Sequence, residues 1–303
     1  MQFFRYPLLH WILEANGGDG ADGRGGSGGY IWLQTNALGA VTVNAAMSVK
    51  GGDSTGSGSY SGAYTYGIDI YSYNYSSIAP VSPGKIRVAG QYDLRGGNGD
   101  EMSVNGGYLE IYGNKYNQDV TGADVELVGF AAVNLKGGEG ASGGSASWNA
   151  CQLYTYSPGG MPAGPITNEA DIEARGGNAA ATTGSTGGSG GTVAMITNGI
   201  IDPSDIISNS GNIDISGGTG DSGGESTNSM IILSAQHLTN SGNLSANGGN
   251  GTTSGSGGNG GNIYLNSDDI TTPTIYTDTM SVTGGTPGGS DGSINIDTGA
   301  PEY

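Results

Sequence analysis

The segments GNIDISGG at residues 211–218 and GGNIYLNS at residues 260–267 show the pattern that decides the fold. In both segments, apolar residues alternate with polar ones: Ile213 and Ile215 in the first, Ile263 and Leu265 in the second. Such alternation is the period of a strand with one buried face, and apolar residues nowhere recur at helical spacing. Glycine at high density also opposes helix formation. The sequence therefore predicts an all-β chain.

The same unit recurs along the chain: an alternating run, Gly-Gly, a loop of small polar residues, and a second alternating run. Repeats of this kind bury their apolar faces by stacking on their neighbours. We therefore expect a parallel β-solenoid of about eight irregular repeats. A β-sandwich is the alternative, but it needs short hairpin turns, which the long glycine tracts fit poorly. The first glycines of the eight Gly-Gly pairs are Gly17, Gly51, Gly96, Gly137, Gly176, Gly217, Gly248 and Gly284.

The glycine tracts at residues 17–29, 187–191 and 248–261 are too long for ordinary turns. One interpretation is a flexible linker. The other is that the tracts stack on one another in an extended, polyproline-II-like conformation, because glycine lets backbones approach closely. Tracts that recur at one place in every repeat favour the second interpretation, a set of stacked, polyglycine-II-like loops.

This unit resembles the glycine-rich β-solenoid proteins of bacterial surfaces and filaments, and its tracts resemble those of phage tail-tip adhesins with packed polyglycine helices. The resemblance covers residues 16–299, with an apolar segment at 1–15 and a short tail at 300–303. It implies extracellular structure, adhesion or filament assembly, and it carries over no catalytic residue.

Composition excludes several classes of protein. The net charge of −18, from 27 acidic and 9 basic side chains, opposes binding to nucleic acid. The 62 glycines lack the three-residue period of collagen, and the lone Cys151 cannot form a disulfide within the chain. The longest apolar stretch, residues 3–13, is too short to insert across a bilayer, which takes about 20 apolar residues.

Motifs for chemistry are weak, and we expect no enzyme. The string GDSGG at 220–224 matches a serine-protease signature, but the chain has only two His and neither lies in the expected motif. A polysaccharide-degrading β-helix enzyme is a third, disfavoured function: its chemistry needs paired carboxylates at a fixed separation, and the adjacent acids Asp268–Asp269 and Asp100–Glu101 are interpreted as solvated loop acids. We expect no cofactor and no dedicated metal site, although scattered Asp and Asn in glycine loops leave adventitious Ca²⁺ open.

Two groups of side chains are candidate interaction sites. An exposed tyrosine platform would stack on sugar rings or on a neighbouring subunit, with Tyr71, Tyr73 and Tyr75 on one face of a strand; the alternative is a ladder that covers the flank of the stack. An apolar N-terminal segment would cap the first repeat or pack against another subunit. The platform is Tyr60, Tyr64, Tyr66, Tyr71, Tyr73 and Tyr75; the segment is Phe3, Phe4, Tyr6, Leu8, Leu9, Trp11, Ile12 and Leu13.

Four cations occupy one position of the repeat, because Lys50, Arg95, Lys136 and Arg175 each precede a Gly-Gly pair. In a stack they would form a basic ladder, which needs neighbouring acids to be stable. We expect Asp53, Asp100 and Glu139 to neutralise it.

These features favour an extracellular structural or adhesive protein at a cell or virion surface. It would be a self-assembling subunit or shaft of a surface filament whose main partner is itself, by head-to-tail or lateral contacts. The alternative is a phage or cell-surface receptor-binding adhesin that recognises surface glycans.

Overall fold

The computed structural model describes residues 12–21, 23–36, 41–54, 65–73, 85–99, 104–113, 124–128, 132–156, 163–180, 182–198, 205–252, 255–267 and 279–298. Within these ranges the chain forms 22 strands and no helix, which confirms the predicted all-β class. None of the described segments therefore offers an apolar helix long enough to cross a bilayer.

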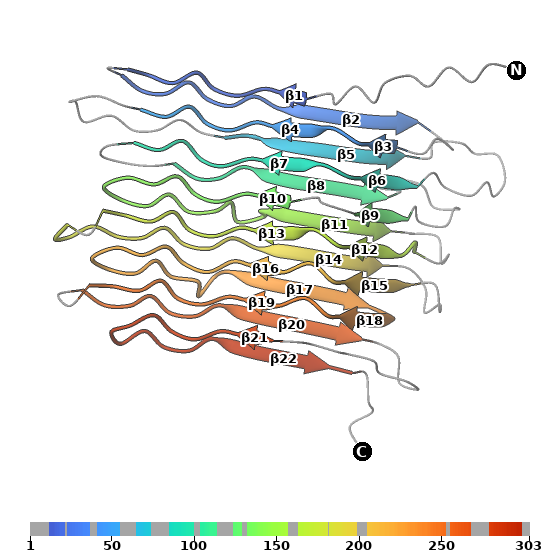
Figure 1. Cartoon of the computed structure of the whole chain (residues 1–303). Helices are drawn as coiled ribbons and strands as arrows, with labels where there is room; N and C mark the ends of the chain where they lie inside the picture. Colours follow the sequence, from blue (N-terminus) through green and yellow to red (C-terminus); the bar gives the residue numbers. More distant parts are fainter. Residues whose placement is uncertain are drawn as a thin grey trace, which may run out of the picture.

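The strands form three parallel sheets, and Figure 1 shows the repeats lying one below another, so that each sheet runs down the stack. Along each sheet the strands follow one another in chain order, because each repeat adds the next strand. The first sheet contains β1 (Ile12–Glu14), β4 (Ala46–Ser48), β7 (Gln91–Asp93), β10 (Ala132–Asn134), β13 (Asp171–Glu173), β16 (Ile213–Asp214), β19 (Leu244–Ser245) and β21 (Met280–Ser281).

The second sheet has the longest strands, and the third has fewer strands among the described residues. The second contains β2 (Ile31–Asn36), β5 (Gly67–Tyr73), β8 (Tyr108–Gly113), β11 (Cys151–Tyr156), β14 (Val193–Asn198), β17 (Met230–Ala235), β20 (Asn262–Ser267) and β22 (Ser293–Asp297). The third contains β3 (Val41–Val43), β6 (Ile86–Val88), β9 (Val125–Leu127), β12 (Ile166–Asn168), β15 (Ile206–Asn209) and β18 (His237–Asn240).

The eight Gly-Gly pairs are in register, as the repeat predicts. The N–H of Gly51 donates to the carbonyl of Arg95, and the N–H of Gly96 donates to Lys136 in the next repeat. The same bond recurs from Gly17 to Gly248. All strand pairs among the described residues are parallel, so the antiparallel hairpins of the sandwich alternative are not seen there. The strand β1 lies inside the segment 1–15, so the first repeat begins before residue 16.

Every second side chain of the long strands points into one continuous core. In β8, Leu109 and Ile111 are fully buried, and β5 and β11 place Ile68, Ile70 and Leu153 beside them. Burial of each such side chain stabilises the fold by about 1.5–3 kcal/mol. The residues immediately preceding the pre-Gly-Gly position form a further buried row, which includes Val49, Leu135 and Ile215, whereas Val282 in the last repeat is half-buried.

Three buried asparagines close the third sheet at its end. The Nδ2 of Asn168 donates to Oδ1 of Asn209 (2.6 Å), and the Nδ2 of Asn209 donates to Oδ1 of Asn240 (2.5 Å). Each Nδ2 also donates to a carbonyl two residues further on in its own repeat. These partners satisfy amides that would be costly to bury alone. In earlier repeats Val43, Val88 and Leu127 occupy the corresponding position.

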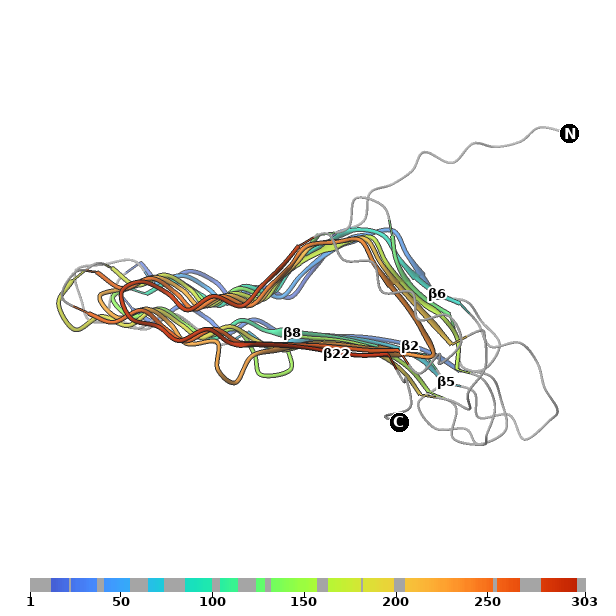
Figure 2. The ribbon, with the colours of Figure 1, turned by 90° about the horizontal axis from the view of Figure 1, so that it is seen from below.

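The glycine tracts leave the body as a narrow arm. Figure 2 shows the repeats superposed, with the strands at the broad end and the tracts running outward and back at the narrow end. Outgoing and returning tracts hydrogen-bond alternately, from Gly144 to Gly138 (3.0 Å), from Gly177 to Gly144 (2.7 Å) and from Gly188 to Gly177 (2.9 Å). This zigzag continues through Gly218, Gly224, Gly249 and Gly258 to Gly285. The tracts are therefore packed and paired, and the linker interpretation is wrong for the described residues.

Candidate functional site

The four predicted cations lie in one row that runs from repeat to repeat along the stack. Each one precedes its aligned Gly-Gly pair. Two further rows flank them, two residues before and three residues after. Lys50 contacts Asp53 at 3.1 Å and Lys136 contacts Glu139 at 3.2 Å, as the sequence predicts. Asp100, the third predicted partner, lies outside the described residues.

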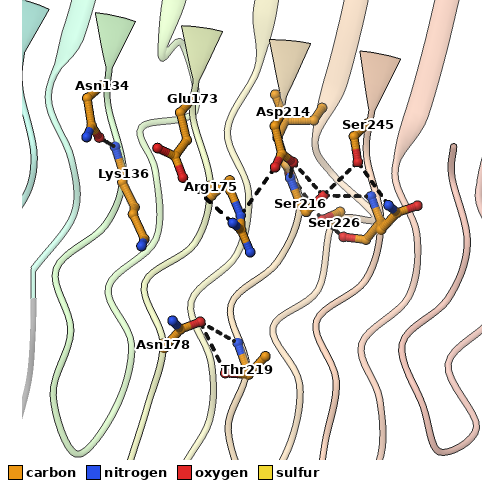
Figure 3. A network of polar contacts seen from close by, with 12 residues as sticks. Asn134, Lys136, Glu173, Arg175, Asn178, Asp214, Ser216, Thr219, Ser226 and Ser245 are labelled. Carbon is orange, nitrogen blue, oxygen red and sulfur yellow. Dashed lines mark hydrogen bonds and ion pairs between the residues drawn. The ribbon is translucent and has the colours of Figure 1, made fainter. Parts of the chain in front are cut away.

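The two arginines use the other flanking row, which the sequence analysis missed. Arg95 makes two bonds to the Asp93 carboxylate, 2.8 Å from Nε and 2.7 Å from Nη2. Arg175 lies 3.7 Å from Glu173 and 3.5 Å from Asp214 of the next repeat (Figure 3). Burial alone would raise the pKa of Asp93, but the hydrogen bonds and charge of Arg95 outweigh it, so that pKa lies below its ordinary value. The basic row is thus neutralised by its neighbours.

The row three residues after the cations joins successive repeats through side-chain oxygens. The Oδ1 of Asp53 accepts the N–H of Asn98 (2.9 Å), and the Oδ1 of Asn98 accepts the N–H of Glu139 (2.7 Å). The Oδ1 of Asn178 accepts the N–H and hydroxyl of Thr219 in the same way (Figure 3). These side-chain oxygens satisfy backbone N–H donors, which need a partner wherever water is excluded. The row also lines a shallow groove of about 750 Å³ across the arm.

The tyrosine platform differs from the prediction. Tyr60, Tyr64 and Tyr75 lie outside the described residues, as does the side chain of Tyr73. Tyr66 is exposed, but Tyr71 is only 5% exposed, so the prediction of an open face is wrong at Tyr71. Its ring is covered by Tyr112 of the next repeat, with ring centroids 5.4 Å apart.

Tyr71 belongs to a ladder that runs across the strands. Tyr112 stacks on Tyr154 with centroids 5.1 Å apart and planes 6° apart. All three residues are paired in register in β5, β8 and β11. The sequence signal for this ladder is the alignment of IYSY, IYG and LYTY in successive repeats. The crowding of tyrosines at residues 60–75 instead suggested a surface formed within one segment.

Acidic and amide side chains bind the tyrosine hydroxyls. The Tyr71 hydroxyl donates to Glu110 (3.0 Å), the Tyr112 hydroxyl donates to Gln152 (2.8 Å), and the Tyr30 hydroxyl donates to Asp69. Burial, followed by these acidic neighbours, raises the pKa of Tyr71 above its ordinary value. The outer face of the second sheet is therefore an aromatic and acidic face in the first four repeats.

Two exposed indoles were not predicted from the sequence, where only the tyrosines form a cluster. Trp32 on β2 is 58% exposed, and Trp148 in a turn before β11 is 61% exposed. The tryptophans do not cluster in the sequence, so only their exposed positions in the structure mark them as candidate site residues. Trp32 shares the aromatic and acidic face, whereas Trp148 stands beside a separate pocket.

The apolar N-terminal segment is described only from Ile12. Phe3, Phe4, Tyr6, Leu8, Leu9 and Trp11 lie outside the described residues. Ile12 and Leu13 belong to β1 and are exposed at the outer edge of the first sheet. At the opposite end of the stack every residue of β22 is exposed, including Ile294 and Ile296.

Groups for covalent or metal chemistry are not assembled in the described part of the chain. Burial raises the pKa of the Cys151 thiol to about 12, which leaves it protonated and unreactive. No group of three or more His, Cys, Asp and Glu is placed to hold a metal ion there.

The fold defines this chain as an all-β protein of three stacked parallel sheets with a hydrogen-bonded glycine arm. Comparison with protein-family models, with curated proteins and with solved structures gives no match.

Proposed function

We propose that the protein is an extracellular structural and adhesive protein, a self-assembling subunit or shaft of a surface filament. Its body is a parallel β-solenoid, and its arm is a stack of polyglycine-II-like tracts. The regular register of eight repeats supports this proposal, because each repeat offers the next one the same row of donors and acceptors. Assembly, rather than catalysis, is then the mechanism.

The main support for this proposal is that the two ends of the stack have complementary apolar rows and strand edges. The core row that begins at Ile31 ends at Ile294, and the row that begins at Leu33 ends at Ile296. Both isoleucines are in the last strand, where they are 41% and 45% exposed. A second copy that places β2 against β22 would repeat the pairing that β20 and β22 already make, and would cover this apolar edge.

Gly18 supports the same joint. In later repeats the second glycine of the pair faces a carbonyl of the preceding repeat: a Cβ on Gly177 would lie much closer than 3.0 Å to the oxygen of Gly138. Gly52, Gly138, Gly218, Gly249 and Gly285 are confined similarly. A Cβ on Gly18 would meet nothing within 4 Å. In a head-to-tail joint Gly18 would face Gly285 of the neighbouring copy, and the glycine would be needed there.

Charge favours head-to-tail over tail-to-tail contact. All 9 Lys and Arg lie within the first 175 residues, while the C-terminal part of the chain carries only acids. Two C-terminal ends would repel each other, whereas a C-terminal end meets a base-containing N-terminal half in a head-to-tail joint.

A double variant tests the joint. We expect purified protein to form long particles by light scattering and negative-stain imaging, and Ile294→Lys with Ile296→Lys to reduce them to monomers without lowering the melting temperature. Ile206→Lys is the matched control, because Ile206 is 38% exposed but lies on β15, inside the stack. The proposal fails if the wild-type chain stays monomeric at high concentration, or if the double variant assembles like the wild type.

A receptor-binding adhesin that contacts surface glycans is the second candidate. The aromatic and acidic face favours it, because the exposed rings of Tyr30 and Trp32, beside the carboxylate of Asp69, suit sugar rings and their hydroxyls. An adhesin would remain a discrete particle and retain glycan binding when the end variants are introduced.

A further inference from the structure

A separate pocket lies on the side of the stack where the returning arm enters the second sheet. The fourth repeat has two more residues between Ala146 and Cys151 than the fifth has between Gly190 and Val193. The sixth repeat has the same two-residue excess between Ser226 and Ile231. The extra residues form turns, which Figure 2 shows projecting from one side, green in the fourth repeat and orange in the sixth.

These two turns are the walls of the pocket, and the fifth repeat is its floor. The pocket has a volume of about 280 Å³ and is lined by Trp148 from the first turn, by Asn228 from the second, by Glu225 just before the second turn, and by Thr192 beneath. Gly191 allows the close packing of floor and wall, since a Cβ there would come within 3.0 Å of the Ser147 carbonyl and of Ala150.

The side chains around the pocket are available for a ligand. Trp148 is exposed, and within the described part of the chain the side chains of Glu225 and Asn228 have no hydrogen bond or ion pair. The hydroxyl of Thr192 is buried at the floor, with no hydrogen-bond partner among the described residues.

We propose that this pocket binds one ring of a neutral saccharide. The indole of Trp148 offers a flat apolar surface for the C–H face of a sugar, while Glu225 accepts and Asn228 donates and accepts hydrogen bonds from ring hydroxyls. The volume lies just below the range of ~300–1,000 Å³ typical of drug-sized ligands, which suits one sugar ring. Among the lining residues only Glu225 is charged, and residues 176–303 contain no Lys or Arg, so charge opposes the binding of an acidic sugar.

Binding of simple sugars to the whole chain tests this site. The probes are glucose, galactose, mannose and N-acetylglucosamine, with sialic acid as the anionic comparison, measured by saturation-transfer NMR and calorimetry. We expect at least one neutral sugar to bind, sialic acid not to bind, and Trp148→Ala to weaken binding by about tenfold. Tyr264→Ala is the control, because that ring is exposed on β20 and lies outside both the pocket and the aromatic and acidic face.

Glu225→Gln and Asn228→Ala provide independent variants at exposed positions, should Trp148→Ala fail to fold; each is expected to weaken binding several-fold at unchanged melting temperature. The proposal is overturned if no neutral sugar binds at about 100 mM, if sialic acid binds in preference, or if Tyr264→Ala has the effect expected of Trp148→Ala. Binding by a peptide or by a second copy at this pocket, with no sugar bound, would overturn it as well. Since the measurement does not depend on the oligomeric state, it stands apart from the filament proposal.

Discussion

At the residue scale, the arm depends on glycines that have no room for a side chain. Gly177→Ala would place a methyl group against the carbonyl of Gly138 and disturb the bond that Gly177 donates to Gly144. We expect a loss of about 2–4 kcal/mol in the free energy of unfolding, from overpacking and a strained hydrogen bond. Urea denaturation of monomeric protein measures it.

Gly18→Ala is the control for this experiment and also a test of the joint. Because a Cβ on Gly18 meets nothing, the monomer should keep its stability within about 0.5 kcal/mol. The same change should block assembly if Gly18 faces a neighbouring copy. Equal destabilisation by both alanine substitutions would contradict the packing described for the arm.

The buried asparagines are a second residue-scale case, since each depends on its neighbours for hydrogen bonds. Asn209→Ala removes a partner from both Asn168 and Asn240, at a cost of about 3 kcal/mol. Asn212→Ala is the control, because Asn212 makes similar bonds to Asp171 and Asn243 on an exposed face. We expect its cost to stay below about 1 kcal/mol, and similar midpoints for the two variants would refute the difference.

The Arg95–Asp93 pair makes stability depend on pH. The pKa of Asp93 is lowered in the folded chain, so the pair stabilises the fold above the unfolded value of about 3.9 and loses that effect as pH falls through the folded pKa. We expect Arg95→Met to raise the pKa of Asp93, as measured by NMR titration of its carboxyl carbon. An unchanged titration would show that Arg95 does not hold this carboxylate.

At the scale of the element, the tyrosine ladder stiffens the outer face of the second sheet. Tyr112 stacks on Tyr154 and donates its hydroxyl to Gln152. Tyr112→Phe keeps the stacking and should cost about 1 kcal/mol, whereas Tyr112→Ser loses ring and contacts and should cost about 3 kcal/mol. Thermal melts of both variants measure this, and equal losses would mean that the ring contributes nothing beyond its hydroxyl.

Some elements could be predicted from the sequence and others could not, for physical reasons. The strands of the second sheet were predictable, since Leu109 and Ile111 alternate with polar residues on one buried face. The third sheet was not, because strands of three or four residues such as β12 are too short to show a period. The turn at Trp148 was also hidden, because it becomes visible only when the fourth repeat is aligned with the fifth.

The candidate site was predictable only in part, because its members are brought together by stacking. The pairing of Lys50 with Asp53 follows from spacing within one repeat. The contact of Tyr71 with Tyr112 joins residues 41 positions apart and depends on the register between repeats. The sequence therefore leaves Tyr71 between an open platform and a ladder along the flank of the stack, and the structure shows the ladder.

At the scale of the whole molecule, the proposed filament forms when copies of the chain continue the stack end to end. The ends carry matching core rows, and the body and arm keep the same register through eight repeats. In such a filament the direction in which the strands are stacked is parallel to the filament axis. In a filament formed by lateral association, that direction would be perpendicular to the axis.

The measurement that tests this most directly is the helical reconstruction of native filaments by electron cryo-microscopy. Head-to-tail stacking predicts a strand spacing of about 4.8 Å along the filament axis and an axial rise near 40 Å for each eight-repeat subunit. A filament whose 4.8 Å spacing runs perpendicular to its axis, or a preparation that contains only single particles, would contradict the central claim.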